Sequence, residues 1–262
     1  MTLFVTGVAA LSVIAHIRLL GPDVTSYEPH VSDAVSLPFD AAVVLGTWLV
    51  VRREGWTLAS VGLGRAALLP AVAAFGLFWL SAVAFGVATL AATGGRIGFV
   101  FEVAWYWELV HTLLTLTVTN GVSEEFVFRG YVQPVCVALA AGLSRRFAPA
   151  VGIVAASLLF GVAHIPLAVL GFDASLAAVP WVLLGNLIPG VAYGLLYYLT
   201  RNVWYTAFVH GFANAPLVPF DPAAVPAFTT VATLFALLIA VGYRRWARST
   251  DRLLLGHPAA GA

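Results

Sequence analysis

Two adjacent glutamates and an arginine stand out in the stretch GVSEEFVFRGYV, residues 121–132, because the surrounding chain is almost free of charge. Successive residues of an α-helix are about 100° apart, so Glu125 and Arg129 differ by about 40° and can pair on one face. Such a buried ion pair has a purely structural interpretation, which is that it holds the helix in place. Glu124 points about 100° away from Glu125 and about 140° away from Arg129. This second carboxylate therefore needs another explanation.

Two further apolar stretches carry polar residues at helical spacing. Phe160 and His164 are four residues apart in SLLFGVAHIP, and His210 and Asn214 are four apart in FVHGFANAP, so each pair projects from one helix face. A carboxylate such as Glu124 can act as a general base toward water, and an imidazole can share that work or protonate the leaving group. A second histidine with an asparagine can supply hydrogen-bond donors for a developing oxyanion. The set is typical of peptide hydrolysis by an activated water.

The composition indicates that these residues lie within a membrane. The 262 residues are 61% hydrophobic and 10% charged, whereas soluble domains carry about 25% charged residues. An ionisable residue at mid-membrane costs at least about 2.5–3.5 kcal/mol on insertion scales, so it normally faces the protein interior or a water-filled cavity. A net charge of +1 gives no indication of a nucleic-acid partner. The single cysteine, Cys136, excludes an internal disulfide and a cysteine-rich metal cluster.

The pattern of apolar segments and arginines predicts an all-α, polytopic membrane protein. A span needs about 20 mostly apolar residues, and every second connection between the candidate spans is rich in arginine, which favours the cytoplasmic side. We expect about eight crossings with both termini in the cytoplasm, and an N-terminal run that is retained because no basic segment precedes it. The candidate segments are residues 2–20, 36–51, 67–92, 104–141, 149–170, 175–199, 203–219 and 225–243.

Residues 1–262 are expected to form a single membrane-embedded domain, because no polar or Pro/Ser-rich linker divides them. The segment 104–141 is predicted to cross once, as a long, tilted or kinked helix. If the turn at 142–148 joins antiparallel helices, Glu124 lies 17 residues before position 141 and His164 lies 15 residues after position 149. At about 1.5 Å rise per residue the two differ in height by about 3 Å, so they can meet across the hairpin. His210 fits this level less closely.

Three short motifs together resemble those of a known family. EExxxR occurs as Glu124-Glu125-Phe-Val-Phe-Arg129, FxxxH as Phe160-Gly-Val-Ala-His164, and HxxxN as His210-Gly-Phe-Ala-Asn214. In this order, and each on an apolar segment, they look like the motifs of the CPBP family. These are the CAAX-protease and bacteriocin-processing intramembrane proteases, also called the ABI family. The resemblance covers about residues 104–217, the expected protease core, and the count of eight helices also resembles the family.

The resemblance implies roles for individual residues. Glu124 and His164 would activate the hydrolytic water, and His210 and Asn214 would form the oxyanion hole. The remaining motif positions are expected to be supporting, and they are occupied by Glu125, Arg129 and Phe160.

Metal dependence stays open at this point. Glu124, His164 and His210 can supply the three protein ligands of a catalytic zinc ion, and the family is often labelled as metalloendopeptidases. The chain has no HExxH pair, which would bind zinc from one helix. We therefore favour a metal-free glutamate mechanism without a cofactor, and keep zinc as the alternative.

Two other classes of function are kept as alternatives. Buried charges also mark ion pathways in transporters, and Asn186, Pro189 and Gly190 could break the helix at 175–199 as transporter helices are broken. A catalytically silent scaffold or immunity protein is the other class. For the protease, the expected partners are membrane lipid and a peptide or protein substrate in the cell membrane, with lipid-modified tails among the candidates. Nothing in the chain specifies a prenyl pocket, so a prenylated substrate is not assumed.

Overall fold

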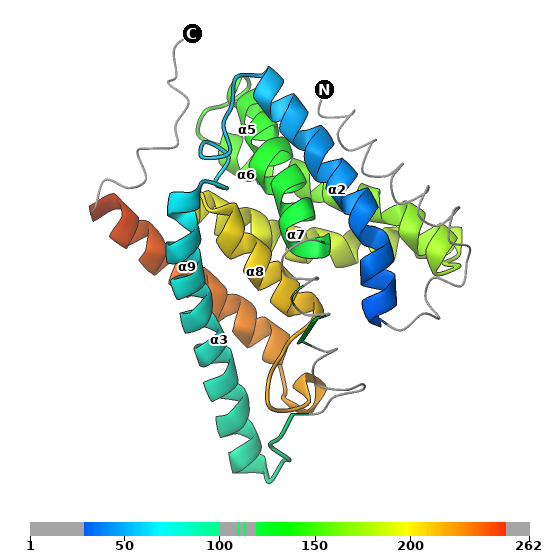
Figure 1. Cartoon of the computed structure of the whole chain (residues 1–262), viewed down its shortest axis with the longest axis vertical. Helices are drawn as coiled ribbons and strands as arrows, with labels where there is room; N and C mark the ends of the chain where they lie inside the picture. Colours follow the sequence, from blue (N-terminus) through cyan, green and yellow to red (C-terminus); the bar gives the residue numbers. More distant parts are fainter. Residues whose placement is uncertain (1–28, 100–108, 111–112, 114–118, 250–262) are drawn as a thin grey trace.

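A computed structural model describes residues 29–99, 109–110, 113 and 119–249, and all regular secondary structure of this part is helical. The prediction of an all-α fold is confirmed for these residues. The predicted segment 2–20 and most of residues 104–118 lie outside the described residues. The α-helices, drawn in Figure 1, are α2 (Pro29–Arg53), α3 (Arg65–Thr93), α5 (Gln133–Ala141), α6 (Ala148–Pro166), α7 (Val179–Thr200), α8 (Val203–Asn214) and α9 (Phe228–Ser249).

Four helical stretches of the described part are long and apolar enough to cross a membrane. They are Arg65–Thr93, Ala148–Leu170, Leu176–Thr200 and Phe228–Ser249. Large apolar side chains on them point outward, as at Leu69, Leu80 and Trp181, which are 77%, 59% and 73% exposed. An apolar surface of this extent is unfavourable in water and suits lipid. The described part of the chain therefore contains four candidate membrane-spanning helices, which coincide with four of the segments that the sequence predicts.

The seventh predicted segment, 203–219, is helical only over α8, which has 12 residues. Its length of about 18 Å is well short of the hydrocarbon core of a bilayer, about 30 Å. The helix ends at Asn214 because Ala215 precedes Pro216, and a residue before proline is pushed out of the α region. Ala215 accordingly has φ −137° and ψ 75°. The prediction placed the end of this helix too late.

Residues 119–141 are continuously helical, but much of this stretch is wound as a π-helix. Thr119–Glu124 and Phe126–Val132 are π-helical, and α5 continues the chain to Ala141. Pro134, in the first turn of α5, has no N–H to donate to the preceding turn. Wider π-helical turns interrupt the usual bonding pattern and are frequent at functional sites. We call residues 119–132 the π-helical segment.

Glycines allow α5, α6 and α7 to approach one another closely. A Cβ atom on Gly152 of α6 would lie 2.6 Å from the backbone nitrogen of Val137 on α5. A Cβ atom on Gly194 of α7 would lie 2.8 Å from Ile153 Cγ2 and 3.0 Å from Gln133 Oε1. Small residues at helix contacts are typical of membrane proteins, where packing replaces the hydrophobic effect as the force between helices. These contacts fix α6 and α7 against each other and against α5, which continues the π-helical segment.

Asn202 fixes the start of α8. Its Oδ1 accepts a hydrogen bond from the backbone N–H of Tyr205 at 3.2 Å, which caps the helix. Its Nδ2 donates to the carbonyl of Ala67 on α3 at 2.8 Å and to the hydroxyl of Tyr243 on α9 at 3.0 Å. The N–H of Val203 also donates to the carbonyl of Gly62, at 3.1 Å. One buried amide therefore ties α8 to α3 and α9.

The candidate functional residues lie where two apolar cores meet. One core joins α3, α7, α8 and α9, and the other surrounds the π-helical segment with α2 and α6. Helix α8 packs against α3, α7 and the π-helical segment, and Figure 1 shows it between α3 and α7. This position brings His210 of α8 toward the glutamates of the π-helical segment.

Candidate active site

Glu125 and Arg129 form a buried ion pair within the π-helical segment. Glu125 Oε2 lies 3.3 Å from Arg129 Nε, and both side chains are almost completely buried. Arg129 Nη2 also donates to the carbonyl of Gly190 on α7, at 3.1 Å. The guanidinium carbon lies 4.7 Å from the ring centre of Phe160 and 5.6 Å from that of Tyr193, so two aromatic faces contribute to its stabilisation. The pair connects the π-helical segment to α6 and α7.

Glu124 faces two histidines from two other helices. Its Oε2 atom lies 3.9 Å from Nε2 of His164 on α6 and 3.9 Å from Nε2 of His210 on α8. The side chains of Glu124 and His164 are about a quarter exposed, at 25% and 26%, whereas that of His210 is 6% exposed. Glu124 Oε2 is itself buried and makes no hydrogen bond with the described protein atoms. One buried carboxylate oxygen and two imidazole nitrogens therefore converge, while other parts of the Glu124 and His164 side chains remain exposed.

Hydrogen bonds at Nδ1 determine what the two imidazoles present at this point. Nδ1 of His164 lies 2.8 Å from the carbonyl oxygen of Phe160, and Nδ1 of His210 lies 2.9 Å from Glu125 Oε1. A carbonyl or a carboxylate oxygen only accepts, so both Nδ1 atoms must carry a hydrogen. A neutral ring then has a lone pair at Nε2, and a protonated ring has a second N–H there. The Nε2 atoms facing Glu124 can thus accept or donate a proton.

Phe160 lies at the centre of this arrangement. Its ring packs against His164 with a centroid distance of 4.4 Å, and edge-on against Phe128 and His210 at 5.1 and 6.0 Å. The side chain is buried. The residue thus holds both imidazoles from one side, in addition to contacting Arg129.

Asn214 is the predicted site residue at the end of α8. It is the last residue of α8 and is exposed, one turn beyond His210 on the same helix face. The structure brings the side chains of the glutamates, the histidines, Arg129 and Phe160 together, and Asn214 lies one helical turn from His210.

Sequence reasoning missed Tyr193. Its ring stacks on that of His210, with a centroid distance of 4.4 Å and an interplanar angle of 24°. It also lies under the guanidinium of Arg129. The chain has eight tyrosines, and nothing in the sequence distinguishes Tyr193 from the others as a site residue. The available signal was its position on α7 between Gly190 and Gly194, which indicates a closely packed helix face.

The spacing of the acidic and imidazole groups can be compared with that of a zinc site. Zinc binds nitrogen and oxygen ligands at about 2.0–2.2 Å in a tetrahedral arrangement. Two atoms 3.9 Å apart would then subtend an angle of about 140° at the metal instead of about 109°. Within the described residues, no group of three His, Cys, Asp or Glu side chains is arranged so that it could hold a metal ion. Glu124, His164 and His210 are of the right type for zinc, but in this arrangement they do not fit it.

Comparison with known proteins gives one match. Residues 105–216 match the family model described as Type II CAAX prenyl endopeptidase Rce1-like. No curated protein and no solved structure matches the chain. The matched segment spans less than half of the chain, but it contains EExxxR, FxxxH and HxxxN, and therefore every residue assembled above. The match over this segment supports the resemblance to the CPBP proteases that the three motifs indicate.

Proposed function

We propose that this protein is an intramembrane endopeptidase in which Glu124 activates a water molecule to hydrolyse a peptide bond. The observation that carries the proposal is the convergence of Glu124 Oε2 with Nε2 of His164 and Nε2 of His210, each 3.9 Å away. Three proton-transfer groups from three helices meet at a partly exposed point in an otherwise apolar protein. A packing role alone would not favour a buried carboxylate oxygen without a hydrogen bond.

In the first step, water held between Glu124 and His164 attacks the carbonyl carbon of the scissile bond. Its proton passes to Glu124 Oε2, while neutral His164 accepts a hydrogen bond at Nε2 because its Nδ1–H is directed to Phe160. The new C–O bond produces a tetrahedral oxyanion. In the second step the proton moves to the leaving nitrogen, the C–N bond breaks, and the products are a carboxylate and an amine.

His210 and Asn214 are proposed to stabilise the oxyanion. Because Nδ1–H of His210 is directed to Glu125, the ring donates from Nε2 only in its protonated form. In that form the two carboxylates of Glu124 and Glu125 are balanced by the guanidinium and the imidazolium. Asn214 supplies an amide N–H from the end of α8 when substrate occupies the site. One donor of this kind contributes about 3–4 kcal/mol to a transition state.

The proposal uses no metal step. The distances of 3.9 Å from Glu124 Oε2 to the two Nε2 atoms are too long for three ligands of one zinc ion. We therefore propose a metal-free site and treat zinc dependence as an outcome of the test. The proposed substrate is a membrane-associated protein or peptide, with a lipid-modified C-terminal tail as one candidate. The proposed location is the cell membrane, as a multi-pass protein with both termini in the cytoplasm.

The test is cleavage of a fluorogenic peptide panel by the purified full chain in lipid nanodiscs, with and without a zinc chelator. The panel contains prenylated and unprenylated C-terminal tails. The proposal expects cleavage that survives chelation and is lost in Glu124→Gln. Cleavage abolished by the chelator would favour zinc. Cleavage that persists in Glu124→Gln would overturn the site assignment, and ion flux without peptide products would favour a transporter.

A further inference from the structure

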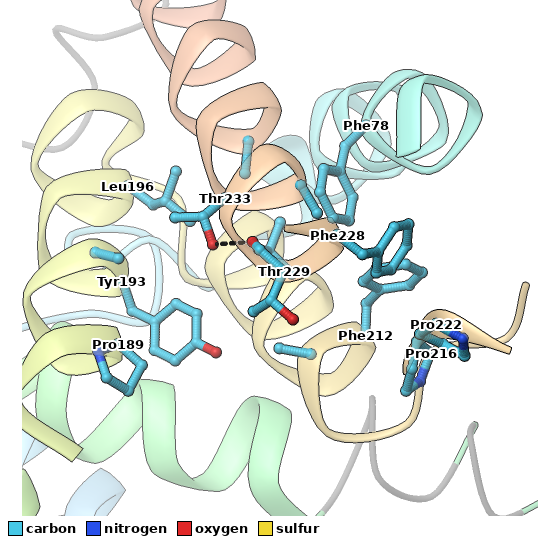
Figure 2. A pocket seen from close by; sticks show the side chains of 15 residues that line it. Phe78, Pro189, Tyr193, Leu196, Phe212, Pro216, Pro222, Phe228, Thr229 and Thr233 are labelled. Carbon is cyan, nitrogen blue, oxygen red and sulfur yellow. Dashed lines mark hydrogen bonds between the residues drawn. The ribbon is translucent and has the colours of Figure 1, made fainter. Parts of the chain in front are cut away.

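Helices α3 and α9 are in contact, but what lies between them changes along their length. Near the start of α9, aromatic rings fill the space. The ring centroid of Phe212 on α8 lies 5.0 Å from that of Phe78 on α3 and 6.4 Å from that of Phe228 on α9. Figure 2 shows these three rings beside a small cavity of about 120 Å³. Toward the start of α3 and the end of α9, the two helices instead leave an open groove.

The groove between α3 and α9 has a volume of about 1030 Å³. Small side chains make room for it, namely Ala66, Ala73 and Ala74 on α3 and Gly242 on α9. A Cβ atom on Gly242 would meet no atom within 4 Å. An engineered apolar cavity of about 150 Å³ holds one benzene molecule. The groove is several times larger and is lined mainly by apolar side chains, so it suits a long hydrocarbon chain.

The groove is about as long as one leaflet of a bilayer is thick. Along α3 its lining runs from Arg65 to Leu77, which is 12 residues or about 18 Å. Half of a hydrocarbon core of about 30 Å is about 15 Å. Tyr243 and Trp246 line the groove toward the end of α9, and such aromatic residues are typical of the membrane–water interface. In a bilayer that α3 spans, the groove would therefore extend from the interface to about the midplane.

The interfacial end of the groove is positively charged. Arg65 lines it, is exposed, and forms no ion pair with another residue that the structure describes. It is also the first residue of α3, whose N-terminus has no side-chain cap and no acidic residue in its first turn. A helix N-terminus favours an anion, and a cation there is unfavourable unless a negative group compensates. An anion at this end would be stabilised both by Arg65 and by the N-terminus of α3.

We infer that this groove binds one acyl chain of an anionic phospholipid, with the headgroup phosphate at Arg65 and the N-terminus of α3. The length of the groove matches one leaflet, and the charge at its end is complementary to the headgroup. Arg245 and Arg248, which are exposed at the end of α9, add to the positive potential that attracts anionic lipid. The inference requires the proposed location in a membrane, but it does not use the peptidase reaction.

The groove is connected to the start of α8 through Tyr243. The hydroxyl of Tyr243 accepts a hydrogen bond from Asn202 Nδ2 at 3.0 Å, and the same Nδ2 atom donates to the carbonyl of Ala67 at 2.8 Å. These bonds hold the end of α9 against the start of α3, on either side of the groove. A lipid bound between the two helices would therefore stabilise the folded protein, because it binds only where this arrangement is formed.

The test measures lipid binding to the purified full chain by native mass spectrometry, without a peptide substrate. Phosphatidylglycerol is the anionic probe, and phosphatidylcholine with the same acyl chains is the zwitterionic control. Arg65→Gln removes the charge at the groove, and Arg145→Gln, at an exposed position between α5 and α6, is its matched control. Gly242→Leu fills the groove. Its matched control is Gly185→Leu, because Gly185 is also exposed and a Cβ atom there also meets nothing within 4 Å.

Wild type is expected to bind phosphatidylglycerol at least about fivefold more tightly than phosphatidylcholine, the effect of one arginine near an anionic headgroup. Arg65→Gln should reduce this ratio to about twofold or less by weakening only the anionic lipid, whereas Arg145→Gln should leave the ratio unchanged. Gly242→Leu should weaken both lipids at least about fivefold, because its side chain occupies the space of the acyl chain. Gly185→Leu should weaken neither lipid.

Equal affinities of wild type for the two lipids would overturn the inference, as would equal effects of Arg65→Gln and Arg145→Gln. Equal effects of Gly242→Leu and Gly185→Leu would place the acyl chain elsewhere and would also overturn it. A dimer that separates into single chains in Gly242→Leu would assign the groove to a second copy of this chain instead of to a lipid.

Thermal unfolding in detergent gives a second measurement and separates this inference from the proposed function. Phosphatidylglycerol should raise the unfolding midpoint of wild type more than phosphatidylcholine does, and Arg65→Gln should abolish the difference. Glu124→Gln should respond to the two lipids as wild type does. A lipid preference without peptide cleavage would count against the proposed function alone, and cleavage without a lipid preference would count against this inference alone.

Discussion

Nδ1 of His210 lies 2.9 Å from Oε1 of Glu125, so the residue next to the proposed catalytic glutamate orients the proposed oxyanion donor. The other oxygen of Glu125 lies 3.3 Å from Nε of Arg129. The buried ion pair that the sequence predicts thus also reaches a third residue on another helix. Glu125 acts through His210 and is a positioning residue.

Glu125→Gln is expected to reduce kcat about 10- to 100-fold, the range typical of partners that orient an imidazole. The amide can still accept a hydrogen bond from Nδ1, but it lacks the charge that balances a protonated ring. KM is expected to change little. Steady-state kinetics with Glu54→Gln as control checks this prediction, because Glu54 is exposed and a glutamine there can still accept the hydrogen bond from the Tyr131 hydroxyl. A large rise in KM with kcat unchanged would assign Glu125 to substrate binding.

Glu125→Ala is expected to cost stability as well as activity. It leaves the buried guanidinium of Arg129 without its carboxylate, and breaking a buried ion pair costs about 3–5 kcal/mol. Thermal unfolding in nanodiscs is therefore expected to show a much lower midpoint than for wild type. A midpoint equal to that of wild type would mean that the pair contributes little to stability.

Tyr193 is expected to act through its ring and not through its hydroxyl. Tyr193→Phe keeps the surface that stacks on His210 and should retain kcat/KM within about twofold on the best peptide of the panel. Tyr193→Leu removes the stacking, which is worth about 0.5–1.5 kcal/mol, and should lower kcat/KM about 2- to 12-fold. If Tyr193→Phe lowers kcat/KM as much as Tyr193→Leu does, the hydroxyl has a role that the stacking does not explain.

Gly194 and Gly185 provide a matched pair on α7. A Cβ atom at Gly194 would lie 2.8 Å from Ile153 Cγ2, whereas a Cβ atom at Gly185 meets nothing within 4 Å. Gly194→Ala is expected to destabilise the protein by about 1–3 kcal/mol, because α6 and α7 must separate. Gly185→Ala should stabilise it by about 0.5–1 kcal/mol through helix propensity. Thermal unfolding of the two variants measures both effects, and a stabilised Gly194→Ala would contradict the packing described here.

Asn202 is expected to control the position of α8. Asn202→Ser keeps a capping oxygen but loses the donors to Ala67 and Tyr243, and Asn202→Ala loses the cap as well, at about 1 kcal/mol more. Unfolding midpoints should therefore decrease from wild type to Ser to Ala. Identical midpoints for Ser and Ala would mean that the cap contributes nothing.

Some of these contacts were accessible from the sequence because they depend on local geometry. The pairing of Glu125 with Arg129 needs only a spacing of four residues, and the approach of Glu124 to His164 needs only the rise per residue and a short turn. The contact of Glu125 with His210 was not accessible. It depends on where α8 starts, which is fixed by bonds from Asn202 to two distant helices and by the backbone contact at Gly62.

The differences between the sequence predictions and the structure have physical causes. The end of α8 was placed too late because hydropathy continues past Asn214, whereas the backbone is stopped by the proline at position 216. The π-helical winding around Glu124 leaves the hydrophobic pattern almost unchanged, so periodicity does not reveal it. Tyr193 was missed because stacking depends on the approach of α7 to α8, and a tyrosine in an apolar helix looks like any other packing residue.

The most direct test of the central claim compares the kcat of Glu124→Gln with that of Glu54→Gln on the best peptide of the panel. Both variants must first be shown to be folded to the same extent as wild type. Both changes replace one carboxylate by an amide, but only Glu124 faces the two imidazoles. Loss of a general base should lower kcat about 100- to 10,000-fold, and Glu54→Gln should retain nearly full activity. A Glu124→Gln protein that cleaves as fast as wild type would show that this carboxylate does not activate the hydrolytic water.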